Sequence, residues 1–175
     1  MKIPSQLPIK DASSIHKVLL VDLNFMGDML MSSPVIRELK RNLGRPIGTI
    51  WCDPYVKVDV LCYDFCKPIV QMNKYVDRIY TTKWRFPLWQ AIKARFRGYD
   101  LVLQLNTSLQ TNLLLFVISK KRLGWSYRFC SIPLTVKIPT EHRTARSGNR
   151  IRENLDLLER AFGWKCEDEK MEIGK

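Results

Sequence analysis

The stretch Leu19–Lys40 constrains the fold most strongly. It opens Leu-Leu-Val-Asp-Leu-Asn-Phe-Met-Gly-Asp-Met-Leu and continues with helical spacing. The apolar run predicts a buried strand, Asn24–Gly27 a short loop, and Asp28 the first residue of a helix. Free backbone N–H groups and the positive end of the helix dipole converge at such a junction, so it is typical of a binding site.

The whole chain alternates between β-prone and helical segments. The predicted strands are Lys17–Leu23, Ile47–Cys52, Lys67–Met72, Asp77–Thr81, Asp100–Leu105, Arg122–Trp125 and Leu134–Ile138. The predicted helices are Asp28–Leu43, Asp53–Cys66, Pro87–Arg97, Leu109–Ser119 and Arg150–Phe162. This alternation predicts an α/β fold, with a Rossmann-like, mainly parallel sheet and helices on both faces. Such a sheet binds ligands beyond the carboxyl ends of its strands.

Proline and glycine predict where several helices begin or end. Asp53 and Pro54 read as the cap and first residue of a helix. Pro34 lies inside a helical pattern, so we expect an irregular first turn there. Gly98 and Gly163 each follow an amphipathic segment and predict its end.

The length of 175 residues fits one domain with a hydrophobic core. Residues 1–16 are polar, contain Pro4 and Pro8, and read as a flexible leader. We expect the Rossmann-like domain over residues 17–165 and an interdomain segment or tail over residues 166–175. The N-terminus has no apolar run of a secretory signal, and Leu113–Ile118 is too short to span a bilayer.

The charge is strongly basic, with 29 Lys and Arg against 17 acids and a formal net charge of +12. Such a surplus favours an anionic partner: nucleic acid, an anionic membrane face or a phosphorylated substrate. Solvated helix faces are the alternative for any single cluster. The clusters are Lys83, Arg85, Lys93, Arg95, Arg97; Lys120, Lys121, Arg122; and His142, Arg143, Arg146, Arg150, Arg152. The third lies beside a helix start, where arginine can bind phosphate.

Asp28 has two interpretations from the residues alone. As a helix cap it would accept backbone N–H bonds. As a general base it would accept the proton of an attacking hydroxyl, although a helix N-terminus favours the charged carboxylate and weakens a base. Gly27 either supplies a positive φ or lets the backbone come close to a ligand. A carboxylate that is partly exposed in a cleft near Arg or His would favour the base.

Motifs of other enzyme classes are absent from the sequence. Neither G-x-G-x-x-G nor G-x-x-x-x-G-K-[ST] occurs, which argues against NAD-binding and P-loop proteins, and no G-x-S-x-G indicates a hydrolase. The five cysteines form no C-x-x-C pair, so we expect no metal site. We expect reduced, mostly buried thiols in a cytosolic protein.

Four stretches, taken in order, resemble glycosyltransferase family 9, the ADP-heptose:lipopolysaccharide heptosyltransferases. Lys17–Lys40 is similar to the family's first strand, Gly-Asp loop and helix. Asn73–Ile79 is similar to its Asn-Pro-x-Val-Asp segment. Tyr99–Trp125 resembles its strand, loop and helix that end in an Arg-Ile-Gly-Phe-like strand. His142–Gly163 resembles its His and Asn-Leu-x-Leu-Leu helix.

The resemblance implies the N-terminal, acceptor-binding half of a glycosyltransferase-B arrangement. It makes Asp28 the general base of an inverting, metal-independent transfer. The implied acceptor-binding residues are Asn24, Phe25, Met26, Gly27, Asn106, Thr107, His142, Arg143 and Arg146. The acceptor would be a phosphorylated lipopolysaccharide core, and Asp22-Leu-Asn24 and Gln104-Leu-Asn106 depart from the family at this site.

The same resemblance assigns the ADP-heptose-like donor to a C-terminal domain that we expect to be absent here. It implies no cofactor for this chain. We therefore expect the chain alone to be inactive, and we expect it in the cytoplasm, at the inner face of the membrane. A non-catalytic basic α/β module that binds nucleic acid or another anionic partner is the alternative.

Overall fold

The computed structural model describes residues 9, 12–43, 56–83, 87–140 and 149–166. In chain order the elements, with 3₁₀ turns marked η, are β1 Lys17–Asp22, α1 Met26–Met31, α2 Ser33–Leu43, β2 Lys57–Tyr63, η1 Asp64–Cys66, α3 Lys67–Gln71, β3 Arg78–Thr82, α4 Leu88–Phe96, β4 Leu101–Gln104, α5 Leu109–Ile118, β5 Arg122–Ser126, η2 Arg128–Ser131, β6 Val136–Pro139 and α6 Arg150–Phe162. The predicted alternation of strands and helices is confirmed.

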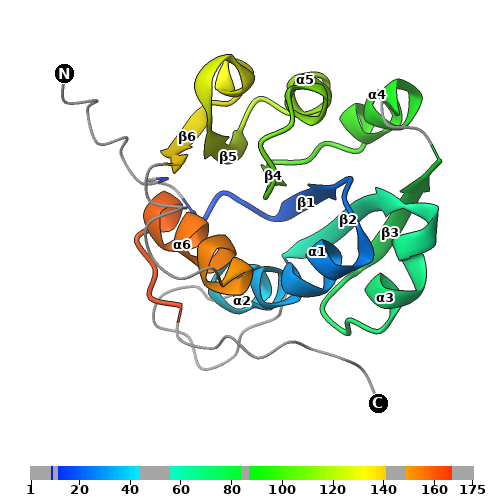
Figure 1. The fold of residues 1–175 in the computed structure, drawn as a ribbon, viewed down its shortest axis with the longest axis horizontal. Helices are drawn as coiled ribbons and strands as arrows, with labels where there is room; N and C mark the ends of the chain where they lie inside the picture. The colour runs from blue at the N-terminus through cyan, green and yellow to red at the C-terminus, as the bar shows by residue number, and fades with distance from the viewer. Residues whose placement is uncertain (1–8, 10–11, 44–55, 84–86, 141–148, 167–175) are drawn as a thin grey trace.

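The described strands form one parallel sheet in the order β3-β2-β1-β4-β5-β6. Helices α4 and α5 cover one face, and α1, α2, α3 and α6 cover the other (Figure 1). β1 lies in the middle of the sheet, between β2 and β4. Both of its faces are buried, since Val18 and Leu20 pack into one core cluster while Leu19 and Val21 pack into the other. A strand buried on both faces reads as a continuous apolar run, which is why β1 is readable from the sequence.

Two predicted elements have the wrong type. The predicted helix Asp53–Cys66 contains β2 and the short turn η1, and the predicted strand Lys67–Met72 is helix α3. β2 pairs with both β1 and β3, so hydrogen bonding between strands overrides local helical signals. Pro68 lies in the first turn of α3, where its missing N–H costs nothing. The predicted strand Ile47–Cys52 lies outside the described residues.

The predicted helix Asp28–Leu43 is interrupted, as Pro34 indicates. α1 ends at Met31, Ser32 forms a turn, and α2 begins at Ser33. The Ser32 hydroxyl donates a hydrogen bond of 2.7 Å to the carbonyl of Met29. Gly98 and Gly163 have φ of 65° and 72°, which confirms them as residues that end helices.

Part of the segment expected as a leader packs against the domain. Ile15 is buried in the core, and the Ile9 N–H donates 2.5 Å to the carbonyl of Ala161. The Asp100 carboxylate accepts bonds of 2.9 Å from the N–H groups of His16 and Lys17. The packed domain therefore includes residues before 17.

Gly124 in β5 lies where a side chain does not fit. An added Cβ would lie 3.2 Å from a Leu134 methyl carbon and 3.3 Å from the carbonyl oxygen of Gln104, whereas nothing lies within 4 Å of a Cβ at Gly27. We expect Gly124→Ala to lower the free energy of unfolding by about 1–3 kcal/mol, because the Gln104 backbone is held in the sheet. Urea unfolding measures this. Gly27→Ala, the matched control, should raise the free energy of unfolding by about 0.5 kcal/mol. A Gly124→Ala variant as stable as the wild type would contradict the close packing at Gly124.

Candidate functional site

The loops after β1 and β4 meet at the carboxyl edge of the sheet. Val21 and Gln104 are paired in adjacent parallel strands, so Asn24 and Asn106 follow close together. The Asn106 amide donates a hydrogen bond to the Asn24 side chain, and the Cys66 thiol donates 3.5 Å to the Asn24 carbonyl. β1 pairs with β2 on one side and β4 on the other, where the strand order changes direction. This is the topological switch point at which open α/β sheets bind ligands.

Asp28 lies in the first turn of α1 but is not its N-cap. The N-cap residue is Phe25, which makes no side-chain cap bond, and the helix begins at Met26. The predicted helix start at Asp28 is therefore two residues too late, and the capping interpretation is wrong for the N-cap position. The Asp28 side chain is half-buried. Gly27 is exposed and is not among the described glycines with positive φ, which leaves close backbone approach as its interpretation.

A pocket of about 200 Å³, here called the Asp28 pocket, opens at this edge. Its lining combines two carboxylates, three amides, one guanidinium and two apolar side chains: Asp22, Asp28, Asn24, Asn106, Asn154, Arg150, Phe25 and Leu105. Arg150 begins α6 and lies 3.4 Å from Glu153, and the Asn154 amide donates 3.3 Å to the carbonyl of Met31. Asp28 thus shares a pocket with an arginine, which is the arrangement expected of a base.

Asp22 also lines this pocket, although it is not among the site residues predicted from the sequence. It is the last residue of β1, only 2% exposed, and its Oδ1 has no hydrogen-bond partner in the described structure. Burial raises the pKa of Asp22 to about 7, and the negative charge of Asp28 raises it further. The hydrogen bond from Asn24 and the positive charge of Arg150 act in the opposite direction and lower this pKa. The sequence signal that could have identified Asp22 as a site residue is its position as the one carboxylate at the end of an apolar, buried strand.

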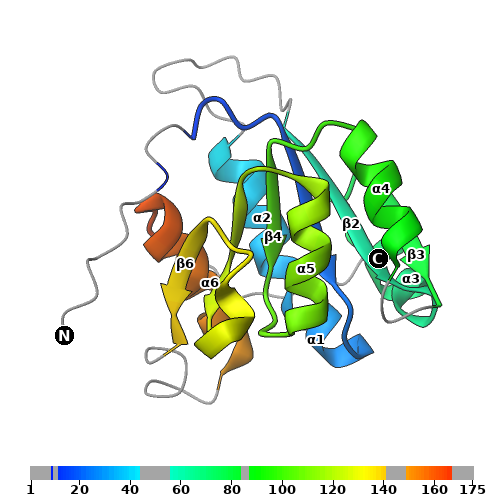
Figure 2. The same ribbon diagram turned by 90° about the horizontal axis from the view of Figure 1, so that it is seen from above.

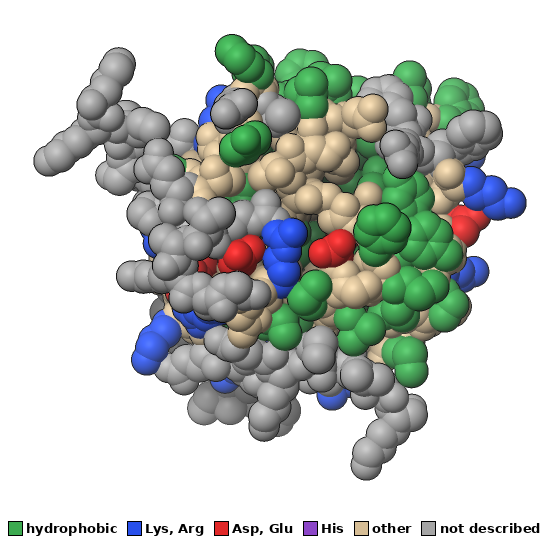
Figure 3. Space-filling view, viewed as in Figure 1, with side chains coloured by type: hydrophobic (Ala, Val, Ile, Leu, Met, Phe, Trp, Pro, Cys, Tyr) green, Lys and Arg blue, Asp and Glu red, His purple; other side chains and the backbone are tan. Residues whose placement is uncertain are grey.

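A larger groove of about 620 Å³, here called the aromatic groove, adjoins the Asp28 pocket and shares Asn24, Phe25 and Asn106 with it. The Tyr63 and Phe65 rings stack with centroids 5.4 Å apart. Asp64 and Lys83 are the charged residues of its lining, and Phe25 is 79% exposed. Hydrophobic side chains gather over α1 and α3 on this face (Figure 3). Flat aromatic surface beside amides and hydroxyls suits a sugar, which has apolar C–H faces and polar edges.

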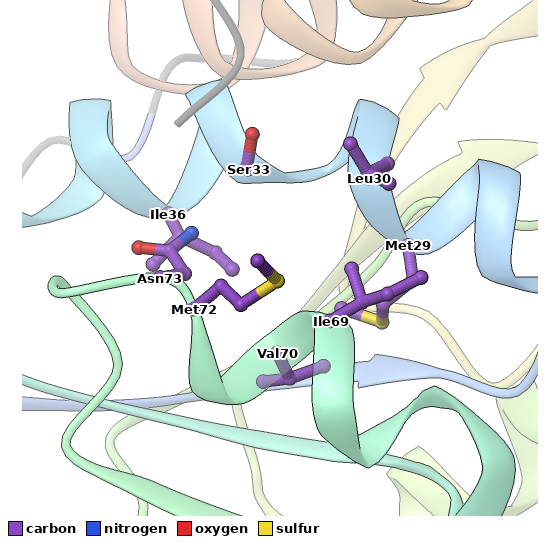
Figure 4. A pocket seen from close by; sticks show the side chains of 8 residues that line it. All are labelled: Met29, Leu30, Ser33, Ile36, Ile69, Val70, Met72 and Asn73. Atoms are coloured by element: carbon purple, nitrogen blue, oxygen red, sulfur yellow. The ribbon is translucent and has the colours of Figure 1, made fainter. Parts of the chain in front are cut away.

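A third hollow, of about 20 Å³, separates α1 and α2 from α3 (Figure 4). Its lining is almost wholly apolar, with the thioethers of Met29 and Met72 near Ile69 and Val70. This volume holds about one water molecule, so we interpret it as a packing gap rather than a ligand site.

The structure brings together only part of the predicted site. Asn24, Phe25, Asn106 and Asp28 line the Asp28 pocket. Met26 and Gly27 lie in the first turn of α1, and Thr107 lies in the loop after β4. His142, Arg143 and Arg146 lie outside the described residues. Within the described ranges, no group of three or more His, Cys, Asp or Glu could hold a metal ion, and no helix is long and apolar enough to cross a membrane.

The described cysteines do not form a reactive site. Cys62, Cys66 and Cys166 are free and buried. Burial raises the pKa of Cys66 to about 11 and those of Cys62 and Cys166 to about 12, so these thiols stay protonated at neutral pH.

The chain is similar to lipopolysaccharide heptosyltransferase 3 of Escherichia coli, with 26% identity over 148 residues. The match covers 78% of this chain and 40% of that protein, so the chain spans less than half the length of this curated relative. No family model matches the chain.

Solved structures share the fold. The E. coli heptosyltransferase WaaC with ADP has a TM-score of 0.68 and 16% identity, over 89% of this chain and 50% of that one. A glycosyltransferase family 9 protein from Veillonella parvula has a TM-score of 0.66 and 16% identity, and the match covers 90% of this chain and 44% of that protein. These similarities confirm the α/β fold and the resemblance to glycosyltransferase family 9 that the motifs indicate.

Proposed function

We propose that this chain is the acceptor-binding half of a heptosyltransferase-like glycosyltransferase, and that Asp28 is its general base. The observation that carries the proposal is the position of Asp28: a half-buried carboxylate beside Arg150 in a polar pocket, at the switch point of a parallel sheet. The similarity to heptosyltransferase 3 supports the reaction class.

The proposed step is an inverting displacement. The acceptor hydroxyl attacks the anomeric carbon of the donor sugar on the side opposite the nucleotide. A new C–O bond forms while the bond from that carbon to the phosphate oxygen breaks, and the nucleoside diphosphate leaves with the electron pair. The hydroxyl proton passes to Asp28. This scheme assigns no metal and no cofactor to the chain.

The proposed acceptor is a phosphorylated lipopolysaccharide-core-like glycan. Its sugars would lie along the aromatic groove, with the reacting hydroxyl in the Asp28 pocket. Arg150 lines that pocket and supplies a cation for phosphate there. His142, Arg143 and Arg146, which come shortly before it in the sequence, are proposed as further phosphate ligands. The proposed place of action is the cytoplasmic side of the inner membrane, where a lipid-linked acceptor is accessible.

The proposed donor is a nucleotide sugar like ADP-heptose, bound by a second domain. Structures similar to this chain contain ADP or ADP-2-deoxy-2-fluoro heptose, and the chain covers half of each of those two proteins. The remaining half of such an enzyme would complete the site across a cleft.

We expect a purified protein of these 175 residues to transfer no sugar, because they match only half of each of the two similar heptosyltransferase structures. A fusion that joins it to a nucleotide-sugar-binding domain should transfer sugar to a lipopolysaccharide-core oligosaccharide. Release of nucleoside diphosphate, followed together with the glycan mass, measures both. Turnover by the isolated chain would contradict the half-enzyme proposal.

A further inference from the structure

Helices α4 and α5 lie side by side on one face of the sheet (Figures 1 and 2). Their inner sides are buried through Ala91, Ala94, Leu114 and Leu115. The Arg95 guanidinium donates 3.1 Å to the carbonyl of Val117 and so links the two helices. The outer sides of both helices therefore form one continuous surface.

This outer surface is apolar to an unusual degree. On α4, Trp89 is 65% and Phe96 86% exposed; on α5, Phe116 is 60% exposed. Leu88, Leu109 and Leu113 are exposed beside them, and η2, which packs against α5, adds Phe129 and Ile132. We call these eight residues the α4–α5 face. Exposed apolar clusters of this kind mark interaction sites on soluble proteins.

The sequence of α5 supports the same conclusion. It reads Leu-Gln-Thr-Asn-Leu-Leu-Leu-Phe-Val-Ile and carries no charge. After the polar residues of its first turn, its last six residues are all apolar, and a helical segment that is apolar all round belongs in a core or against another apolar phase. Only one side of α5 is packed on the sheet, so its other side lacks a covering layer among the described residues.

The sequence that contains the α4–α5 face is rich in cations. From Lys83 to Lys137 the sequence has ten Lys and Arg and one acid, Asp100. That carboxylate is engaged with the backbone of His16 and Lys17. Lys93 and Arg95 are exposed on α4, and Arg97 is exposed directly after it. The Lys93 ammonium lies 5.7 Å from the centre of the Trp89 ring, whereas the Arg97 guanidinium lies over Tyr80. Cations among exposed aromatic residues, with almost no acids, are complementary to an anionic lipid surface.

We propose that the α4–α5 face docks on an anionic lipid bilayer. The aromatic and aliphatic side chains enter the interface, and Lys93, Arg95 and Arg97 meet lipid phosphates. The first turn of α5 also contributes Gln110 and Thr111 to the aromatic groove. A bilayer on this face therefore lies next to that groove, within reach of a lipid-linked acceptor. This last consequence rests on the proposed function, but the docking itself does not.

Vesicle co-sedimentation of the 175-residue chain tests the proposal without donor or acceptor. We expect binding to phosphatidylcholine vesicles that contain one-third phosphatidylglycerol, and weakening by added salt. Phe96→Ser combined with Phe116→Ser, and separately Lys93→Gln with Arg95→Gln and Arg97→Gln, should each weaken binding at least roughly tenfold. Met72→Ser is the matched control: Met72 is 48% exposed beside α3, on the opposite side of the sheet, and its loss should leave binding unchanged.

Three results would overturn the proposal. They are no binding to anionic vesicles, equal binding to pure phosphatidylcholine, and equal loss in Met72→Ser. A dimer in gel filtration that Phe96→Ser with Phe116→Ser converts to monomer would instead assign the face to a second copy of the chain. Because no sugar is transferred in this assay, failure of the proposed catalysis would leave its outcome unchanged.

Discussion

Replacement of Asp28 by asparagine should lower the rate of sugar transfer by about 10²–10⁴-fold, which is the usual contribution of a general base. The enzyme for this test is a fusion of this chain to a nucleotide-sugar-binding domain. Asparagine keeps the shape of the side chain but cannot accept the hydroxyl proton. Asp28 is half-buried and is not the N-cap of α1, so the melting temperature should change little. Initial rates at saturating donor and acceptor measure kcat.

Glu153→Gln is the matched control for Asp28→Asn. Glu153 lies one turn into α6, 3.4 Å from Arg150, but does not line the Asp28 pocket. Its replacement removes one negative charge near the same arginine, so kcat should change by no more than a few-fold. Equal losses in both variants, or an unchanged kcat in Asp28→Asn, would reduce Asp28 to an electrostatic or structural role.

Asp22→Asn should stabilise the protein at alkaline pH by about 2–4 kcal/mol and have almost no effect near pH 4. Burial raises the pKa of Asp22 from 3.8 to about 7, so between these values the folded state holds a proton that the unfolded chain releases. The contribution of Asp22 to stability therefore falls as pH rises from about 4 to 7 and stays low above it. Asparagine is neutral throughout and avoids this loss.

Urea unfolding of both proteins at pH 4, 6 and 8.5 measures the effect of Asp22→Asn. The difference in unfolding free energy should grow from near zero at the lowest pH to its full value at the highest, and the wild-type profile at low pH is the internal control. A difference that does not depend on pH, or a variant less stable than wild type at pH 8.5, would contradict a buried, largely uncompensated carboxyl group at Asp22.

Much of the central architecture is readable from the sequence because its signals agree. β1 is buried on both faces and so is continuously apolar, Pro34 coincides with the break between α1 and α2, and Gly163 adopts the left-handed conformation that ends α6. The loop that contains Asn24 and Phe25 follows directly from that strand and leads into α1. This is why Asn24, Phe25 and Asp28 could be placed together before the structure was known.

The remaining features depend on contacts that are distant in sequence. β2 is a strand because β1 and β3 pair with it on both sides, and local pattern alone suggested a helix. Asp22 reads as the end of a strand, and only the fold places it beside Asp28 and Arg150. The exposure of Phe96 and Phe116 likewise depends on how α4 and α5 pack, because their spacing also fits a buried core.

The most direct test of the account is to map where the acceptor binds on the isolated chain. Backbone amide spectra of the ¹⁵N-labelled protein would be recorded during titration with a phosphorylated lipopolysaccharide-core oligosaccharide. We predict the largest shifts at Asn24–Asp28 and Asn106, with smaller ones along the aromatic groove at Tyr63 and Phe65. Shifts confined to the amino edge of the sheet, or none at saturating oligosaccharide, would contradict an acceptor site at Asp28.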